Sequence, residues 1–433
     1  MKTVRELFQK SKEFAGRISV SFQSRNFRLY FGGMCVSLIG TWIQQTAMSW
    51  LAYKLTGSVL FLAGITFMAQ IPLLLFTPFT SVFADRYNRR RILLLTQSLS
   101  ALQALLLAWL SFSGAIETWH LMTLSLFLGL INALDNPARQ AFYPGLVAPE
   151  HLNNAIALHS VVINGSRLIG PAIGGIIIGI AGEAVCFFIN GISYLGVIIA
   201  LVSMHLPFRQ IRKIHPSVRS DLNEGFLYVS RHLPIRSLLL LISIVSFFGL
   251  PLVTFIPAYV KTILNGESEM LGYLLSCIGF GSLMAALGLA ARRTVAGLEK
   301  LLPIHTLLLG FSLSLLAFTH SPVLAALILI PAGFFLIMTV AIINSLLQAL
   351  ADEDKRGRVM GYLAMTFTGI SPLGCIGLGY LEKYTSLPVV ILLAGIVCVL
   401  SGLTFEYYRP LIYPYSRPIL LRKRVIKSDK SVK

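Results

Sequence analysis

Long apolar runs separated by short polar connections dominate the chain. Twelve of these runs are long enough to cross a bilayer, which takes about 20 helical residues for roughly 30 Å of hydrocarbon. They cover residues 29–53, 59–84, 92–113, 119–139, 154–181, 184–206, 238–261, 270–291, 301–319, 323–349, 359–382 and 386–408. The pattern therefore predicts an all-α membrane protein with twelve transmembrane helices.

Basic residues are distributed asymmetrically over the connections. All but four of the 36 Lys and Arg residues lie before the first run, after the last run, or in or beside every second connection. The exceptions are Lys54, Lys261 and Lys383 in the other connections and Arg167 inside the fifth run. Because Lys and Arg accumulate on the cytoplasmic side of membrane proteins, we expect twelve spans with both termini in the cytoplasm.

Composition agrees with a membrane location. The chain is 55% hydrophobic and only 12% charged, and its mean hydropathy is +0.76. The net charge of +18 would suit nucleic-acid binding in a soluble protein. Here the bases follow the topology, so we expect them to orient the chain and to meet anionic lipid headgroups, with no nucleic-acid partner.

The longest polar connection divides the twelve spans into two sets of six. We therefore predict two pseudo-symmetric six-helix bundles joined by a linker that carries a short amphipathic helix. The predicted segments are a cytoplasmic N-terminal segment at 1–28, a bundle at 29–206, a cytoplasmic linker at 207–237, a second bundle at 238–408 and a basic cytoplasmic tail at 409–433.

Corresponding spans of the two sets carry similar Gly/Pro motifs. Span five contains IGPAIGG at 169–175, and span eleven contains ISPLGC at 370–375. Paired helices interrupted in this way point to a transport pathway at a repeat interface. Close helix packing is the other interpretation, and the two are compatible. The predicted helix-break residues are Gly170, Pro171, Gly174, Pro372 and Gly374.

The connection 81–91, SVFADRYNRRR, resembles the G-x-L-A-D-R-x-G-R-K signature of the major facilitator superfamily. Ser81 and Asn88 replace the two glycines of that signature. The matching residues are Asp85, Arg86, Arg89 and Arg90.

Further segments are similar to one branch of that superfamily, the multidrug, macrolide and enterobactin exporters. They are GTWIQQTAMSWLAYKLTGS at 40–58, NALDNPARQAFYPGLV at 132–147, LNNAIALHS at 152–160, SRLIGPAIGG at 166–175 and GRVMGY at 357–362. The resemblance implies a secondary exporter of a drug-like compound or siderophore in the bacterial inner membrane, working by alternating access. Nutrient uptake, lipid flipping and a non-transporting receptor or scaffold on the same fold are the alternatives.

The resemblance also implies a gate on the cytoplasmic side. It places Asp85 beside the start of span eleven, near Gly357 and Arg358, where the helix dipole favours an anion by about 0.3–1 kcal/mol. The contact would latch the two halves and break as they rock apart. Topology marking alone is the alternative for the arginines. The gating residues are Asp85, Arg86, Arg89, Arg90 and Arg358.

Charged residues inside the spans are the main candidates for coupling, because such charges are costly in a bilayer. Asp135 and Arg139 are spaced to pair at i, i+4, and Arg167 precedes the Gly170-Pro171 motif. We expect these three residues to form a network that couples proton movement to transport. The alternative is a static ion pair, with Arg167 capping backbone carbonyls. Span one contains no acidic residue, which weakens the case for proton antiport.

Amides in the spans are the candidates for substrate contacts, with interhelical hydrogen bonding as the alternative for each. They are Gln44, Gln45, Asn164, Asn344 and Gln348. The sequence has no P-loop motif and no metal-ligand spacing of histidines, so we expect no enzymatic activity, no metal and no cofactor. We expect a monomer driven by an ion gradient, with protons as the coupling ion.

Overall fold

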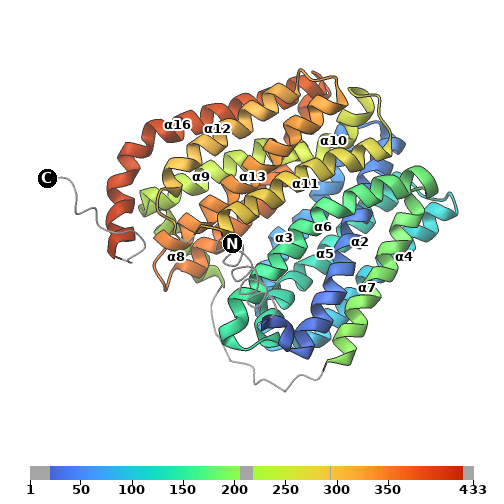
Figure 1. Ribbon diagram of the computed structural model, residues 1–433, viewed down its shortest axis with the longest axis horizontal. Helices are drawn as coiled ribbons and strands as arrows, with labels where there is room; N and C mark the ends of the chain where they lie inside the picture. The colour runs from blue at the N-terminus through green and yellow to red at the C-terminus, as the bar shows by residue number, and fades with distance from the viewer. Residues whose placement is uncertain (1–19, 205–217, 293, 423–433) are drawn as a thin grey trace, which may run out of the picture.

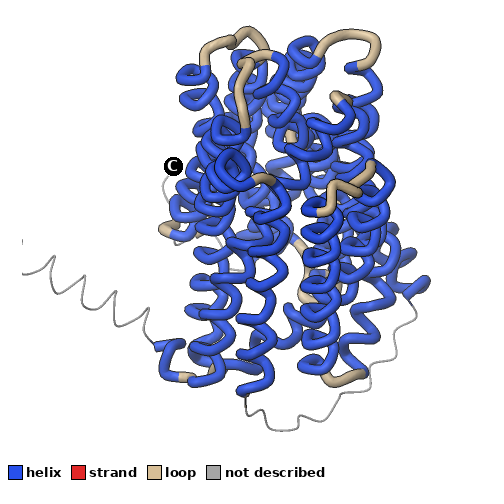
Figure 2. The backbone as a smooth tube through the Cα atoms, turned by 90° about the vertical axis from the view of Figure 1, so that its right-hand side faces the viewer, coloured by secondary structure: helices blue, strands red, loops and turns tan. Residues whose placement is uncertain are grey.

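The computed structural model describes residues 20–204, 218–292 and 294–422. Within these ranges every regular element is helical (Figure 2). The elements are η1 (Val20–Gln23), α2 (Arg25–Thr56), α3 (Val59–Arg86), α4 (Arg89–Phe112), α5 (Thr118–Phe142), η2 (Tyr143–Leu146), η3 (Pro149–His151), α6 (Leu152–Ala181), α7 (Glu183–Ser203), α8 (Val218–Arg231), α9 (Leu233–Phe248), α10 (Pro251–Thr262), α11 (Ser268–Ala290), α12 (Leu298–Leu316), α13 (Pro322–Leu350), α14 (Arg356–Met365), the π-helical turn η4 (Thr366–Ile370), α15 (Ser371–Glu382) and α16 (Leu387–Arg422). The parts of the predicted segments at 1–19, 205–217 and 423–433 lie outside the described residues.

Eleven described segments are long and apolar enough to cross a membrane, with α9–α10 and α14–α15 each counting as one. The remaining predicted span, α2, is 32 residues long and carries polar residues such as Gln44, Gln45 and Thr46. It packs against α6 and α7 as a member of the bundle. With α2 included, the described residues contain a long helical segment at each of the twelve predicted spans.

Two helices extend beyond their predicted ends. α9 begins at Leu233 instead of 238, because Pro234 occupies a first-turn position where its missing N–H costs nothing. α16 continues to Arg422 instead of ending at 408, and Ile412 and Ile419 of this extension pack against a buried apolar cluster. The residues from 409 to 422 are thus helical.

The helices form two groups, which Figure 1 shows in blue to green and in yellow-green to red. We call α2–α7 the first half and α9–α16 the second half. We call the end where α4 begins at Arg89 and α14 begins at Arg356 the basic end of the molecule. We call the opposite end, where Gly57 follows α2 and Gly182 follows α6, the far end. α8 packs against α9 and α14 at the basic end of the second half.

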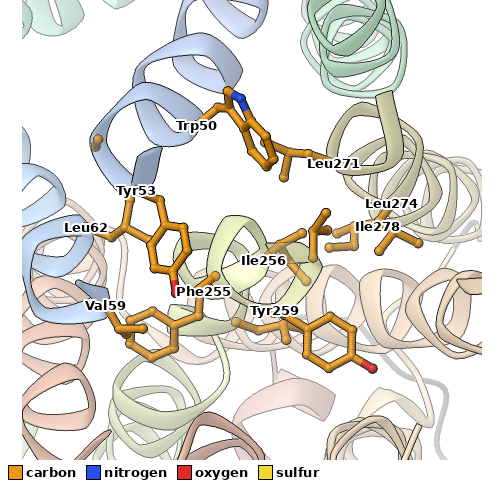
Figure 3. Packing of buried hydrophobic residues seen from close by; sticks show 14 of the residues in the cluster. Trp50, Tyr53, Val59, Leu62, Phe255, Ile256, Tyr259, Leu271, Leu274 and Ile278 are labelled. Atoms are coloured by element: carbon orange, nitrogen blue, oxygen red, sulfur yellow. The ribbon is translucent and has the colours of Figure 1, made fainter. Parts of the chain in front are cut away.

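The two halves share an apolar core near the far end. Trp50 of α2 points toward Leu271 of α11, and Tyr53 points toward Phe255 of α10 (Figure 3). All four residues are at least 90% buried. Other members of this core are Val59, Leu62, Ile256, Tyr259, Leu274 and Ile278. In this conformation, apolar side chains seal the far end between the halves.

Glycines bring α6 and α11 into backbone contact across the same interface. A Cβ atom on Gly272 would lie 2.4 Å from the carbonyl oxygen of Pro171, and one on Gly175 would lie 2.9 Å from the Gly272 Cα. A Cβ on Gly279 would lie 2.6 Å from the carbonyl oxygen of Arg167. Because real Cβ atoms do not approach this closely, any larger residue here must push the halves apart.

The Gly/Pro motifs lie at equivalent contacts within each half. Gly170 packs on Trp42 of α2, and Gly374 packs on Phe247 of α9. The predicted interruption differs between the two spans: α6 runs unbroken through Pro171, whereas the π-helical turn η4 precedes Pro372. A proline ring displaces the carbonyl one turn earlier, and a π-turn is one way to accommodate it.

Candidate functional site

Asp135 lies inside the first half and is fully hydrogen-bonded. Its Oδ1 accepts from Thr96 Oγ1 at 2.6 Å and Gln97 Nε2 at 2.9 Å, and its Oδ2 accepts from Arg139 Nε at 2.9 Å. Arg139 also donates to Oδ2 through a second guanidinium nitrogen and contacts the Met34 sulfur. The carboxylate is 2% exposed, so the group joins α4 and α5 through a buried, paired charge.

Arg167 does not belong to that group of contacts. It lies at the middle of α6, and no carboxylate of the described residues is within 4.0 Å of it. Its Nε is buried without a hydrogen-bond partner, and its Cζ lies 5.1 Å from the ring centroid of Trp42. A charge at the bilayer centre costs about 2.5–3.5 kcal/mol on insertion scales, while a cation–π contact returns about 0.5–2 kcal/mol. Trp42 therefore offsets only part of the cost.

Of the predicted substrate-contacting amides, Gln44 is committed to helix packing. Its Nε2 donates to Gln103 Oε1 at 3.1 Å, and its Oε1 accepts from Asn190 Nδ2 at 2.8 Å. Gln44 is only 4% exposed. It thus fits the interhelical alternative, because these bonds join α2 to α4 and α7.

The other four amides are more accessible. Gln45 is exposed, and Asn164 is partly exposed and donates to the carbonyl oxygen of Ser160 in its own helix at 2.8 Å. Gln348 of α13 donates to Asn344 at 3.1 Å, one turn earlier. These side chains keep unused donors or acceptors, so they are available to a polar ligand.

The predicted gate arginines of the first half bind backbone oxygens there. Arg89 donates to the carbonyl oxygen of Ala141 at 2.8 Å, and Arg90 donates to that of Val202 at 2.8 Å. Arg86 is exposed. The side chain of Asp85 lies outside the described residues, so the predicted contact of Asp85 with the start of span eleven stays a prediction.

Arg358, the gate residue of the second half, is held by the linker helix. Its guanidinium lies 2.8 Å from Glu224 Oε2 of α8, and Lys355 binds the other oxygen of the same carboxylate. Tyr228, one turn later, donates to Asp352 Oδ2 at 3.0 Å and accepts from the Asp352 backbone N–H. We call this set of contacts the α8 clasp.

The α8 clasp is charged over a wide pH range. The hydrogen bond from Lys355 lowers the pKa of the Glu224 carboxyl from its usual 4.5, and the same bond raises the pKa of Lys355 from 10.5. The stabilisation from Glu224 is present above its usual pKa and is lost as the pH falls through the lowered value. The stabilisation from Lys355 is present below pH 10.5 and is lost as the pH rises through its raised pKa. The clasp should therefore hold from mildly acidic to strongly alkaline pH.

We expect Glu224→Gln to release α8, because the neutral amide cannot pair with both Lys355 and Arg358. Amide hydrogen exchange across 224–231 should then be several-fold faster at neutral pH than in the unaltered protein. Asp354→Asn is the matched control. Asp354 Oδ2 lies 3.3 Å from Lys355, but Asp354 is the chain neighbour of Lys355 and does not belong to α8. Equal exchange rates in all three proteins would contradict the clasp.

A cavity of about 640 Å³ lies at the far end, between residues of both halves. Two ion pairs border it, Lys54 with Glu183 at 3.0 Å and Lys261 with Glu267 at 2.7 Å. Trp50 forms part of its wall. The charges of these two ion pairs are thus paired within one half, so the pairs do not join the halves.

Comparison with known proteins places most of the chain in one family. The model of the transmembrane secretion effector family matches residues 19–411. The staphyloferrin A transporter of Staphylococcus aureus is 24% identical over 350 residues, which cover 81% of this chain and 87% of that protein. The multidrug efflux pump Tap of Mycolicibacterium fortuitum is 25% identical over 379 residues, covering 83% and 91% of the two chains.

Solved structures show the same fold at low sequence identity. A bacterial homologue of the human lysosomal transporter Spinster, in an inward-facing and unoccupied conformation, has a TM-score of 0.67 at 14% identity and covers 93% of this chain and 99% of its own. A point mutant of the nucleoside transporter NupG has a TM-score of 0.68 at 13% identity and covers 88% and 98%. The chain therefore belongs to the transmembrane secretion effector family, in the efflux branch of the major facilitator superfamily of multi-pass membrane transporters.

Proposed function

We propose that this protein exports a small organic molecule, a drug-like compound or a siderophore, across the bacterial inner membrane. The observation that carries the proposal is the family match over residues 19–411, because the relatives that span most of the chain include a siderophore transporter and a multidrug efflux pump. The protein acts as a monomer with both termini in the cytoplasm, and its basic end meets anionic lipid headgroups.

Alternating access is the proposed mechanism. With the basic end in the cytoplasm, the far end faces outward, and the apolar core around Trp50 and Leu271 closes that side. Export then requires this core and the α6–α11 glycine contact to separate while the basic ends approach each other. In that second conformation Asp85 would meet the start of α14, so Arg358 would have to leave the α8 clasp.

Proton movement is the proposed driving force, with Asp135 and Arg139 as the element that responds. Asp135 is the only acidic residue of the described chain that is buried within a span, and its pairing with Arg139 holds α4 and α5 together. Protonation would remove the charge attraction and leave Arg139 to rearrange. Arg167 has no described contact with this pair, so any coupling between them would act through helix movement.

A gene deletion tests the export and its energy source together. Cells lacking the gene should retain a compound that wild-type cells secrete, under iron limitation or in ordinary growth. A plasmid copy should restore secretion, a protonophore should abolish the restoration, and Asp135→Asn at equal protein level should restore far less. Absence of any retained compound would count against export, and depletion of a nutrient inside the mutant would indicate uptake. Full restoration by Asp135→Asn would remove Asp135 from the mechanism.

A further inference from the structure

Arg167 is a cation at membrane depth whose charge is not compensated by the described residues. It is the sixteenth residue of the 30-residue helix α6, so roughly 22 Å of helix lie on either side of it. Its Nε is buried without a partner, and no hydrogen bond of its guanidinium to a backbone carbonyl is found among the described residues. Arg167 therefore neither pairs with a carboxylate nor caps a helix in this conformation.

Trp42 orients this guanidinium without using its donors. The indole lies 5.1 Å from Cζ, where it provides a cation–π contact. Such a contact leaves the N–H groups of the fork unbound. Arg167 is partly exposed as a residue, although its Nε is buried. The arrangement leaves a planar set of donors ready for a planar acceptor.

Two accessible amides flank this position. Gln45 follows Trp42 by three residues in α2, and Asn164 precedes Arg167 by three residues in α6, so each lies one helical turn from its neighbour. Asn164 spends one donor on Ser160, which leaves its carbonyl oxygen free among the described contacts. A ligand beside Arg167 would thus meet further polar groups next to an aromatic surface.

We propose that Arg167, supported by Trp42, binds a carboxylate group of the transported molecule, which makes the substrate class an organic anion with an apolar or aromatic body. The inference rests on the proposed export function. A carboxylate matches the guanidinium fork through two parallel hydrogen bonds. A lipid phosphate is a poor match, because Arg167 lies at mid-helix and headgroups lie at the membrane surfaces.

The position of Arg167 links binding to the movement of the halves. Its own carbonyl oxygen lies against Gly279 of α11, where a Cβ atom would be 2.6 Å away. An anion bound to the side chain thus acts on a residue whose backbone forms the contact between α6 and α11. Binding that shifts Arg167 would loosen or tighten that contact directly.

Binding of benzoate and benzamide to the purified protein in zwitterionic nanodiscs tests the site. The two molecules have nearly the same shape, but only benzoate is an anion at neutral pH. Calorimetry should show that benzoate binds at least tenfold more tightly than benzamide. Arg167→Gln should weaken benzoate at least tenfold and leave benzamide unchanged, and Arg167→Lys should fall between, because an ammonium keeps the charge but loses the fork. Arg236→Gln, at an exposed arginine of α9, is the matched control and should bind benzoate normally.

Ligand-free stability separates a site from a structural role. If Arg167 awaits a ligand, Arg167→Gln removes an uncompensated charge, and its Tm without benzoate should be higher than that of the unaltered protein. A lower Tm, equal binding of benzoate and benzamide, or undiminished benzoate binding by Arg167→Gln would overturn the proposal. Inorganic phosphate that displaces benzoate at equal concentration would overturn the assignment to an organic carboxylate. Because the assay measures binding without flux, its failure is distinguishable from failure of the export experiment.

Discussion

Replacement of Gly272 by valine is expected to lower transport at least tenfold. A Cβ atom at this position would lie 2.4 Å from the Pro171 carbonyl oxygen, so α6 and α11 must separate to admit the side chain. Overpacking of this kind costs about 1–3 kcal/mol, which changes the ratio of two conformations by about 5- to 150-fold. Since that cost falls only on the conformation closed at the far end, the protein should become trapped with the far end open.

Flux and a distance measurement check this expectation together. Spin labels on cysteines at Ala115 and Lys383, in a background without the five native cysteines, report the separation of the halves at the far end. The longer distance should dominate in Gly272→Val. Gly288→Val in the same helix is the control, because a Cβ there meets only the flexible Met338 side chain, at 3.6 Å. Unchanged distances and flux in Gly272→Val would show that the α6–α11 contact does not open during transport.

Asp135→Leu is expected to destabilise the protein by about 3–5 kcal/mol, the usual cost of breaking a buried ion pair by removing one partner. The reason is that Arg139, whose side chain is only 19% exposed, keeps its charge after its carboxylate partner is gone. Thermal unfolding in detergent should show a clear drop in Tm. The double variant Asp135→Leu, Arg139→Met should recover most of the loss, because no charge is then left unpaired.

A surface pair provides the matched control for that cycle. Glu406 and Arg409 in α16 form an i, i+3 pair at 2.7 Å with both side chains partly exposed. Glu406→Leu should cost no more than about 1 kcal/mol, as exposed pairs usually do. A loss of similar size in Asp135→Leu and Glu406→Leu would contradict the view that burial makes the Asp135 pair important. Transport by the stable double variant would show the pair to be structural.

Hydropathy predicted the helical spans, and the resemblance of residues 81–91 to the superfamily signature predicted the fold. The twelve spans follow from apolar run length, and α2 shows where that signal weakens, since its polar residues lower its hydropathy. The Asp135–Arg139 pair was predicted from helical spacing alone, because residues four apart share a face. These predictions succeed because they depend on positions within one helix.

Contacts between helices that are distant in the chain could not be predicted from the sequence. Spacing could not show that Gln44 bonds to Gln103 and Asn190, nor that Arg167 lies apart from Asp135, since both depend on the rotation of each helix in the bundle. Glu224 went unnoticed because a single acidic residue in a polar linker carries no distinctive pattern. The sequence carried one signal for the hydrogen bonds of Gln44, namely polar residues such as Gln103 and Asn190 inside apolar spans.

The bonds of Gln44 have a consequence for biogenesis. α2 precedes α4 and α7 along the chain, yet its buried amide Gln44 finds its partners on those two helices, which emerge from the ribosome later. Until α7 has been inserted, the amide of Gln44 has to bind water or lipid headgroups. The membrane-inserted position of α2 is therefore less stable during this stage. The sixth span of the first half therefore completes the insertion of the first, so a chain that stalls before α7 should be an early target for membrane quality control.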